Sequence, residues 1–418
     1  MLKRLNRSDI GQASPPAVDP AAAAVAAEII ADVAAQGEAS LRARAFSLGD
    51  IESPDARITV SRDDCDEALA SLDEESSQAL RRAAEGIERF ATAQRSSVQP
   101  CEVPVPGGVA RQHIAAIDAA GCYAPGGRYP LPSSVLMTAV TARVAGCRHV
   151  VVASPRPSKA TLAAASIAGA DTVLCVGGAQ AIAAMVQGIP GVCPACQAIA
   201  GPGNRYVTAA KQLVSGRVRI DMLAGPSELL VIADESGDPA VIAADLLAQC
   251  EHDADARGIL VTISDDLAHA VDTELERQLE TLPTADTARE ALTNGFACVV
   301  ESIDEAAAIS NEIAPEHLEV HVADTDAAVD LLTDYGALFI GHAAAEVFGD
   351  YGAGPNHTLP TGGTARSFGG LSVFDFLRIR TSLQINDRGA ARRLAQDAAR
   401  LARIEGLEAH ARSAECRL

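Results

Sequence analysis

The fold class is decided by residues 149–187, which read HVVVASPRPSKATLAAASIAGADTVLCVGGAQAIAAMVQ. Short runs rich in β-branched residues alternate here with Ala-rich stretches of helical character. The runs lie at 149–153 and 172–176, and the helical stretches at 159–168 and 179–187. This alternation is typical of βαβ units, in which helices connect parallel strands. A further apolar run at 197–200 continues the pattern, so the sequence predicts an α/β fold with a parallel sheet.

A second block of the same texture follows. Strands are expected at 229–233, 259–263, 298–301, 318–322 and 337–340, with a helix at 239–249 and a long helical stretch up to residue 294. Pro239 suits the first turn of its helix, where a missing N–H costs nothing. The two blocks share the alternation of strand-like and helical segments, but their sequences are not repeats of each other. We therefore expect a second α/β sheet domain of similar design.

The flanking segments differ from both blocks. Residues 20–35 and 73–90 have helical spacing, and the Pro-rich passage 99–108 is interpreted as a boundary. A Gly-rich loop at 343–370 is long enough to suggest a functional role. Residues 388–410 are rich in Ala and Arg and predict a small helical appendage. At roughly 150 residues per domain, a chain of 418 residues predicts two or three packed units.

Composition excludes several classes of protein. The formal charge is −21 and there is no Trp, which argues against binding to nucleic acid or to an anionic membrane. No apolar run is long enough to span a bilayer, and the first ten residues do not resemble a signal peptide. The ten cysteines are interpreted as free thiols in a reducing, cytoplasmic setting. Cys193 and Cys196 form a lone CxxC, and no second pair follows to complete a zinc site.

Three Gly-rich turns punctuate the first block, at 125–127, 176–180 and 201–204. In open α/β sheets, such turns beyond the strand ends supply backbone N–H groups to ligands. The complete dinucleotide fingerprint GxGxxG is absent, because Gly201-Pro-Gly203 is followed by Asn204 and lacks the third Gly. The turns are therefore either phosphate cradles or ordinary tight turns.

Several polar residues have the spacing of a metal or acid–base site. Gln249 and His252 lie three residues apart at the end of a predicted helix and share one face. Asp350 and His357 lie in the Gly-rich loop, and His410 lies near the C-terminus. Imidazole and carboxylate groups suit Zn²⁺, although each histidine alone is more often a surface or core residue. The remaining histidines have no supporting context; they are His113, His149, His269, His321 and His342.

Glu316 and His317 directly precede a predicted strand and follow Pro315, which has a fixed φ. A carboxylate beside an imidazole is a plausible acid–base couple near neutral pH. The alternative is a solvated pair at the entrance to a strand. The residues alone leave both interpretations open.

Six motifs in one order connect these residues to a known family. They are Gly201-Pro-Gly-Asn204, Asp221-Met-Leu-Ala-Gly-Pro-Ser-Glu228, Gln249-Cys-Glu-His252, Ala314-Pro-Glu-His-Leu318, Gly354-Pro-Asn-His-Thr-Leu-Pro-Thr-Gly-Gly363 and Glu405-Gly-Leu-Glu-Ala-His410. With them the chain resembles the histidinol dehydrogenases, zinc enzymes that end histidine biosynthesis. The resemblance extends from about residue 20 to residue 413. One departure is Phe90-Ala91, where the family often has Phe-His; no catalytic residue depends on it.

The resemblance implies two incomplete Rossmann-like domains and an intertwined homodimer. The larger domain is expected to comprise residues 15–98 and 227–372 and to carry most zinc and catalytic residues. Residues 99–226 would form the NAD-contacting domain, and residues 1–14 and 373–418 small terminal or dimerisation segments.

The resemblance also implies a set of site residues. Expected zinc ligands, for one Zn²⁺ per subunit, are Gln249, His252, Asp350 and His410, and the expected catalytic pair is Glu316 and His317. Beyond His317 and the ligands, substrate contacts are expected from Ser227, His357 and Glu405, and NAD contacts from Tyr123, Gln180 and Asn204. Glu405 and His410 would come from the other subunit.

The implied reaction is oxidation of L-histidinol to L-histidine through L-histidinal, with two NAD⁺. Four N and O ligands would leave zinc positions for the amine and imidazole of histidinol, so that the ion acts mainly as a template. His317 would serve as base in both oxidations, and Glu316 would activate water to hydrate the aldehyde. No cysteine is needed.

Three other functions compete with this interpretation. One is a paralogue with the same zinc and NAD chemistry, such as a sulfopropanediol dehydrogenase. Its anionic substrate would need a cationic side chain at the position where the ammonium of histidinol needs an anionic one, and Glu405 at that position favours the amine. A zinc hydrolase would not need the Gly-rich turns with Tyr123, Gln180 and Asn204. A scaffold that had lost catalysis would be expected to lack some of the site residues, and all are present.

Overall fold

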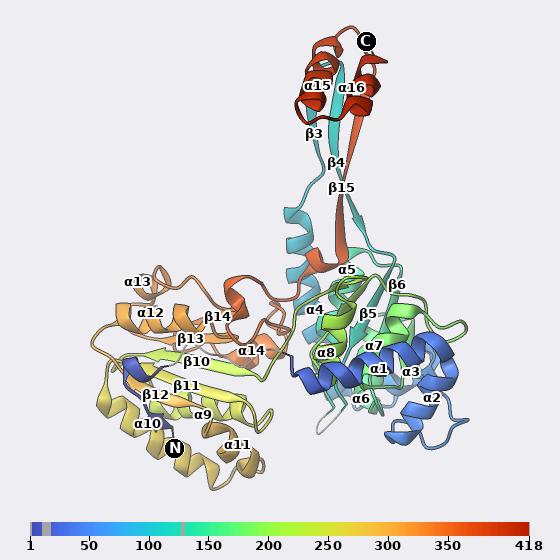
Figure 1. Cartoon of the computed structure of the whole chain (residues 1–418). Helices are drawn as coiled ribbons and strands as arrows, with labels where there is room; N and C mark the ends of the chain where they lie inside the picture. Colours follow the sequence, from blue (N-terminus) through green and yellow to red (C-terminus); the bar gives the residue numbers. More distant parts are fainter. Residues whose placement is uncertain (1, 11–17, 127–129, 418) are drawn as a thin grey trace.

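The computed structural model describes residues 2–10, 18–126 and 130–417. Two lobes lie side by side, each built on a six-stranded sheet, and a long thin arm rises from one of them (Figure 1). We call the lobe from which the arm rises lobe 1 and the other lobe 2. The mixed α/β class with parallel sheets, expected from the sequence, is confirmed. Gly127, the last residue of the predicted 125–127 turn, lies outside the described residues.

Lobe 1 contains residues 149–187, whose alternating pattern predicts the α/β class. Its sheet has the order β2-β7-β6-β5-β8-β9, in which all pairs are parallel except β2 with β7. The strands are β2 (Thr59–Val60), β5 (Ala119–Tyr123), β6 (His149–Ala153), β7 (Thr172–Leu174), β8 (Ala198–Ala200) and β9 (Arg219–Ile220). The connecting helices are α5 (Pro132–Ala145), α6 (Lys159–Ile167), α7 (Gly178–Gln187) and α8 (Arg205–Val214).

The N-terminal helices cover lobe 1, which differs from the expected grouping of residues 15–98 with 227–372. They are α1 (Pro20–Gln36), α2 (Glu38–Ser47), α3 (Arg62–Ala70) and α4 (Glu74–Ser97). Helix α1 packs on α7 and α8, α3 packs on α6, and α4 packs on α5. The reason is apolar contact: Ala22 and Ala26 of α1 share one core cluster with Ile182, and Ile87 of α4 shares another with Leu136.

Lobe 2 is a fully parallel sheet of order β1-β12-β11-β10-β13-β14. Its strands are β1 (Lys3–Arg4), β10 (Glu228–Ala233), β11 (Arg257–Thr262), β12 (Phe296–Val299), β13 (His317–His321) and β14 (Ala337–Ile340). Its helices are α9 (Pro239–Cys250), α10 (Asp265–Leu279), α11 (Ala285–Leu292), α12 (Ile303–Ile313) and α13 (Thr325–Val329), with a short 3₁₀ turn η1 (Arg7–Asp9) near the N-terminus.

Three expectations for lobe 2 need correction. The helical stretch ending near residue 294 is two helices, because Pro283 lies between α10 and α11 and cannot continue a helix. Strand β12 begins two residues earlier than predicted, at Phe296. Residues 3–4, expected to be part of a terminal segment, form an edge strand beside β12.

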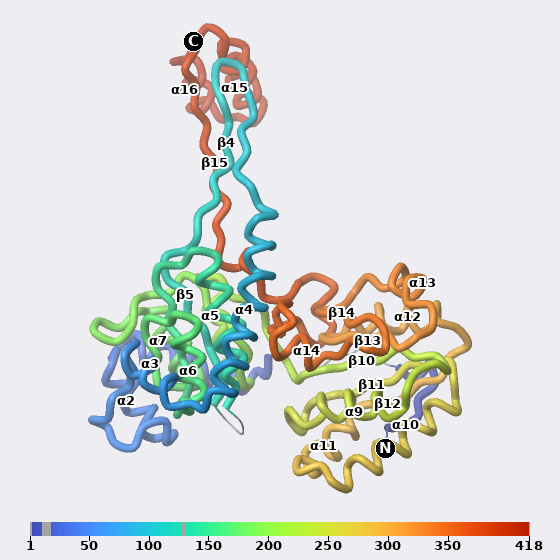
Figure 2. The backbone as a smooth tube through the Cα atoms, turned by 180° about the vertical axis from the view of Figure 1, so that it is seen from behind, coloured from blue at the N-terminus to red at the C-terminus, as the bar shows by residue number. Residues whose placement is uncertain are grey.

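The arm is an antiparallel sheet of order β15-β4-β3, formed by β3 (Cys101–Val105), β4 (Gly108–Ala116) and β15 (Leu377–Ile385). Its tip carries α15 (Arg392–Ile404) and α16 (Glu408–Glu415). Figure 2 shows β4 and β15 running together along the arm. The Pro-rich passage 99–108, interpreted from the sequence as a boundary, supplies β3 and the turn into β4: Pro104 lies on the edge strand, and Gly107 turns the chain with a φ of 77°.

The predicted loop 343–370 lies between the lobes (Figure 1). It contains the short helix α14 (Glu346–Asp350) and the turn η2 (Thr364–Arg366), and η3 (Val373–Phe376) leads into β15. Gly86 of α4 is buried where this loop passes; a Cβ on Gly86 would lie 2.1 Å from the carbonyl oxygen of Gly352. Lobe 1 therefore supports the loop that carries Asp350. Within the described ranges, none of the helices has both the length and the apolarity to cross a bilayer.

Candidate active site

The two residues predicted as a catalytic pair lie at the entrance of β13, beside the first residue of β10. The Glu316 carboxylate accepts a hydrogen bond from the N–H of Glu228 at 2.9 Å. The Nδ1 atom of His317 lies 3.2 Å from the carbonyl oxygen of the same Glu228. Parallel pairing places Leu229 opposite His317, so both contacts follow from strand register. The sheet thereby holds both side chains in place.

His317 is poised as a neutral base. A carbonyl oxygen only accepts hydrogen bonds, so the contact with Glu228 assigns the ring proton to Nδ1. The other nitrogen, Nε2, is buried and has no hydrogen-bond partner among the described residues. Burial lowers the pKa of His317 to about 3, against the opposing effect of the backbone hydrogen bond. The side chain therefore offers an unprotonated Nε2 at neutral pH.

Glu316 has the opposite tendency. Its side chain is buried, and this burial raises its pKa well above the usual range of a carboxyl group; the neighbouring Glu228 and Asp350 add to the shift. Its Oε2 lies 3.7 Å from Nδ1 of His317. The pair is therefore buried and is not a solvated strand entrance.

Potential metal ligands gather next to this pair. His252, Glu346 and Asp350 each offer one ligand atom, and these atoms lie within 4.8 Å of one another. His252 follows α9 and is exposed, whereas Glu346 and Asp350 begin and end α14 and are buried. Two carboxylates and an imidazole form a donor set that suits Zn²⁺. Burial raises the pKa of Asp350 to about 6, a cost that a cation would remove.

Gln249, the last predicted ligand on α9, is fully buried beside the same group. With its amide oriented to satisfy its neighbours, the nitrogen donates to both Glu346 oxygens at 2.5 and 2.8 Å, and the oxygen accepts from the N–H of Glu228 at 3.2 Å. The amide therefore links the ligand group to Glu228, whose backbone also contacts Glu316 and His317. The donor set present thus fits a zinc ion.

Glu346 was missed by sequence reasoning. Its Oε1 lies 3.8 Å from Nδ1 of His317, and burial raises its pKa well above the ordinary value. The available signal was its spacing, because Glu346 and Asp350 are four residues apart and share a face if that segment is helical. The sequence predicts a loop over this segment, so the spacing alone does not identify Glu346.

The other predicted substrate residues are divided between two places. His357 lies beside Asp350, with 3.6 Å between Nδ1 and Oδ1, and its Nε2 lies 3.5 Å from the Ser134 hydroxyl of α5; burial lowers the pKa of His357 to about 4. Ser227 directly precedes β10. Glu405 and His410 are exposed at the tip of the arm, away from this group within the same chain (Figure 1).

The predicted nucleotide-contacting residues lie at the carboxyl edge of the lobe 1 sheet. Tyr123 ends β5, and its hydroxyl accepts the N–H of Gly178 at 3.1 Å; burial raises its pKa to about 12. Gln180 is buried, and its Nε2 has no partner among the described residues. Asn204 caps α8 by accepting two backbone N–H groups. Strand β5 lies between β6 and β8, which is the switch point where open α/β sheets bind ligands.

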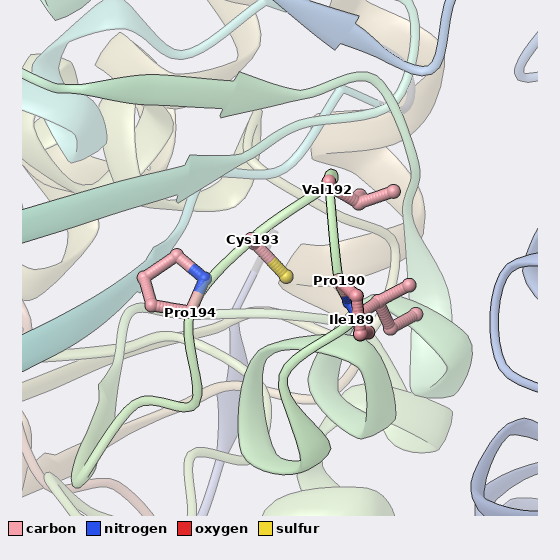
Figure 3. A pocket seen from close by; sticks show the side chains of 6 residues that line it. Ile189, Pro190, Val192, Cys193 and Pro194 are labelled. Atoms are coloured by element: carbon pink, nitrogen blue, oxygen red, sulfur yellow. The ribbon is translucent and has the colours of Figure 1, made fainter.

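The Cys193–Cys196 pair does not form a reactive site. Figure 3 shows the surface pocket of about 360 Å³ formed by the loop around Cys193. Both thiols are buried, and burial raises the pKa of each above its ordinary value, which disfavours the reactive thiolate. All ten cysteines, each within the described residues, are free thiols.

One histidine without sequence context acquires neighbours in the structure. His321 lies on the same face of β13 as His317 and Glu319, and its Nε2 is 3.4 Å from Oε2 of Glu319. Its ring packs against that of His342 at 5.6 Å. Asp245 of α9 completes this buried group, and burial raises its pKa to about 7.

Comparisons with known proteins agree over nearly the whole chain. A family model described as histidinol dehydrogenase matches residues 14–418. Histidinol dehydrogenase of Geobacter sulfurreducens is 44% identical over 401 residues, covering 94% of this chain and 92% of the relative. That of Thermus thermophilus is 47% identical over 353 residues, 84% of each chain. The crystal structure of histidinol dehydrogenase from Elizabethkingia anophelis is 32% identical, with a TM-score of 0.92 over 100% of this chain and 98% of the other.

Proposed function

The chain belongs to the histidinol dehydrogenase family, and we propose that it oxidises L-histidinol to L-histidine through L-histidinal with two NAD⁺. The observation that carries this proposal is the neutral, buried Nε2 of His317, without a partner among the described residues and beside a metal-type donor set. An alcohol oxidation needs such a base, because the hydroxyl proton must leave as the hydride departs.

Gln249, His252 and Asp350 are the residues of this chain that would hold a zinc ion, together with His410 of a second copy. When bound, the ion supplies a template that orients and polarises the amino alcohol. Glu346 keeps the Gln249 amide in place through two hydrogen bonds. We assign Glu346 to positioning this amide; its carboxylate also lies among the possible ligand atoms of His252 and Asp350.

The proton steps are assigned to two side chains. His317 Nε2 takes the hydroxyl proton of histidinol in the first oxidation. The Glu316 carboxylate takes a proton from the water that hydrates the aldehyde, and His317 returns the proton it had taken to the aldehyde oxygen, which becomes the second hydroxyl of the hydrate. Glu316 then releases its proton to solvent. His317 then takes the hydroxyl proton of the hydrate in the second oxidation. Its Nδ1–H remains bonded to the Glu228 carbonyl oxygen throughout, which keeps the ring oriented.

Substrate and nucleotide would approach from the two lobes. We assign two residues to the substrate side: His357, which lies between Asp350 and Ser134, and Ser227, which precedes β10. We assign Tyr123, Gln180 and Asn204 to contacts with NAD⁺, which would supply hydride acceptance when bound. The partnerless amide nitrogen of Gln180 is a donor that such a ligand can use.

A homodimer would complete the site. Large apolar side chains are exposed along the arm and its tip, with 61% of Ile379, 63% of Leu383, 60% of Leu401 and 72% of Ile404 accessible to solvent. Such a surface on a projecting element favours coverage by a second copy. The arm would then deliver Glu405 and His410 to the partner's site, where Glu405 faces the ammonium of histidinol.

The test is the amount of NADH formed per L-histidinol consumed, by chelator-treated enzyme before and after zinc is restored. The expected result is two NADH per histidinol, with zinc only. Absence of NADH from the zinc-loaded enzyme would reject histidinol as substrate, and NADH formation that zinc does not affect would reject the metal.

A further inference from the structure

A second pocket opens at the carboxyl edge of the lobe 1 sheet, in the loop between β6 and α6. Its volume is about 260 Å³, and its lining includes Ser154, Arg156, Ser158 and Thr161. None of these residues belongs to the site described above. All the named groups are positive, neutral donors or backbone N–H groups, which is the chemistry of an anion site.

Ser154 is the most informative member. It is 1% exposed, and its hydroxyl has no hydrogen-bond partner among the described residues. A buried hydroxyl without a partner costs free energy, and such groups are usually satisfied by protein, water or ligand. Because Ser154 lines the pocket, a ligand oxygen placed there can accept its proton.

Two further groups converge on the same space. Ser158 caps α6, a helix of nine residues, by accepting the N–H of Thr161, and the first turn of that helix opens at the pocket. The exposed Arg156 side chain supplies a guanidinium, which binds phosphate oxygens through paired N–H donors. Arg156 interacts electrostatically with the carboxylate of Asp50. That carboxylate already accepts the N–H of Gly177 at 2.9 Å.

The pocket adjoins the residues proposed to contact NAD⁺. Pro155 lies between two glycine turns: a Cβ on Gly126 would lie 2.2 Å from its carbonyl oxygen, and a Cβ on Gly177 would lie 2.7 Å from its ring. Gly177 begins the turn that leads to Gln180, and Gly126 follows Tyr123 by three residues. Gly126 lines the pocket, and Pro155 packs against the turn whose Gly178 N–H is bonded to the Tyr123 hydroxyl, so the pocket lies next to these residues.

Strand order indicates which part of a dinucleotide would reach it. The switch point lies at β5, and β6 is the next strand on one side. In doubly wound dinucleotide-binding sheets, the end of that next strand carries the residue that reads the adenosine ribose, an acid for a free hydroxyl or a nearby Arg for a 2′-phosphate. Here the loop after β6 supplies Ser154 and Arg156 and no acid up to Ser158.

We infer that this pocket binds a phosphate group on the adenosine half of the nicotinamide dinucleotide. The inference rests on the proposed use of NAD⁺ and names a subsite of that cofactor. The phosphate can be the 5′-phosphate that every such dinucleotide carries or the 2′-phosphate of the phosphorylated form. Arg156 and the Ser154 hydroxyl are the specificity-determining groups in either case.

The experiment is calorimetric binding of adenosine, 5′-AMP, 2′-AMP and inorganic phosphate to the full chain. We expect one AMP isomer to bind at least about tenfold more tightly than adenosine, and Arg156→Gln and Ser154→Ala to remove that difference while adenosine affinity stays unchanged. The isomer that gains affinity identifies the source of the phosphate. Because no histidinol is used, the result is independent of whether the proposed oxidation occurs.

The matched control is Arg148→Gln, at the opposite end of β6, where the side chain is 83% exposed and paired with Asp118. It should leave all four affinities unchanged, and thermal unfolding should show that each variant is folded. The inference is overturned if neither AMP isomer binds better than adenosine. It is equally overturned if Arg156→Gln and Arg148→Gln weaken the nucleotides alike, or if inorganic phosphate alone binds and Arg156→Gln does not affect it.

Discussion

The Nδ1 atom of His317 and the carbonyl oxygen of Glu228 lie 3.2 Å apart, on the first residues of two paired strands. This contact fixes both the tautomer and the orientation of the imidazole. A histidine that was only buried could present either nitrogen to the substrate. Anchored in this way, it can present only Nε2, and the anchor is backbone, which a side-chain mutation does not remove.

Replacement His317→Asn should therefore abolish the base while leaving the metal ligands intact. We expect kcat to fall by about 10²–10⁴ with one zinc still bound per chain, measured by steady-state kinetics and metal analysis. His269→Asn, at an exposed position on α10, is the matched control and should leave both unchanged. Near-normal turnover of the His317 variant would exclude it as the base.

Replacement Glu316→Gln preserves shape and an oxygen that can accept the N–H of Glu228. It removes the carboxylate proposed to activate water. Oxidation of histidinal, which needs hydration, should therefore be slowed by about 10²-fold or more, while the first oxidation of histidinol is slowed less. Single-turnover measurements with each substrate separate the steps. Equal slowing of both would contradict the assignment to water.

The proposed exchange of arms predicts complementation between inactive chains. Glu316→Gln retains His410, and His410→Ala retains Glu316, so a mixed dimer regains one intact site of two. Random exchange of subunits should restore about a quarter of wild-type activity. Each variant incubated alone is the control. No recovery, despite subunit exchange demonstrated with tagged chains, would mean that each site is built from one chain.

Gly86 tests the support that lobe 1 gives to the loop carrying Asp350. A methyl group there would lie 2.1 Å from the Gly352 carbonyl oxygen, so Gly86→Ala should displace the loop and cost about 1–3 kcal/mol of stability. Zinc affinity should fall with it, as measured by competition with a chelator. Glu85→Ala, on the exposed side of the same helix, should change neither. Unchanged zinc affinity in a destabilised Gly86 variant would separate loop support from metal binding.

Asp245 predicts a dependence of stability on pH. Its pKa rises from 3.8 to about 7 because of burial and the nearby Glu319. Between these values the folded chain holds a proton that the unfolded chain releases, so stability falls as pH rises from about 4 to about 7. The side chain of Asp245→Asn cannot ionise. The stability of this variant relative to the wild type should therefore rise across that pH range, by an amount on the order of a few kcal/mol.

Denaturation midpoints at pH 5 and pH 8 measure this gain. The control is Asp286→Asn, whose carboxyl is fully exposed on α11 and should follow the wild type at both values. A difference between Asp245→Asn and the wild type that does not change with pH would contradict the raised pKa.

Local pattern and long-range packing differ in how far the sequence predicts them. Strands β6 and β14 have the predicted bounds, because β-branched runs between turns specify strands locally. The packing of α1 and α4 on lobe 1 differs from the expected grouping, since an apolar helix face does not specify its partner. The sequence likewise does not specify the partner of the β3–β4 hairpin, in which β4 pairs with β15 from the C-terminal part of the chain.

The candidate site shows the same division. Most of its members were identified through motifs that resemble a known family, and the structure brings Gln249, His252, Glu316, His317, Asp350 and His357 together. Glu346 was missed because its role arises from contacts with Gln249 and His317, which lie far from it in sequence. Burial and orientation, which give His317 its free Nε2, follow only from tertiary structure.

The order in which a ribosome delivers this chain has a consequence for when it becomes active. His113 of β4 and Ser382 of β15 are hydrogen-bonded although they are 269 positions apart. Arg4 of β1 donates a hydrogen bond to Asp272, which is synthesised 268 positions later. Both terminal regions of the polypeptide thus pair with partners that are 268 or 269 positions away in the sequence. Lobe 1 can assemble early, but the arm is completed only after translation has nearly finished. A nascent chain, or one terminated shortly before residue 405, would possess both sheets and lack the tip residues that the proposed chemistry requires.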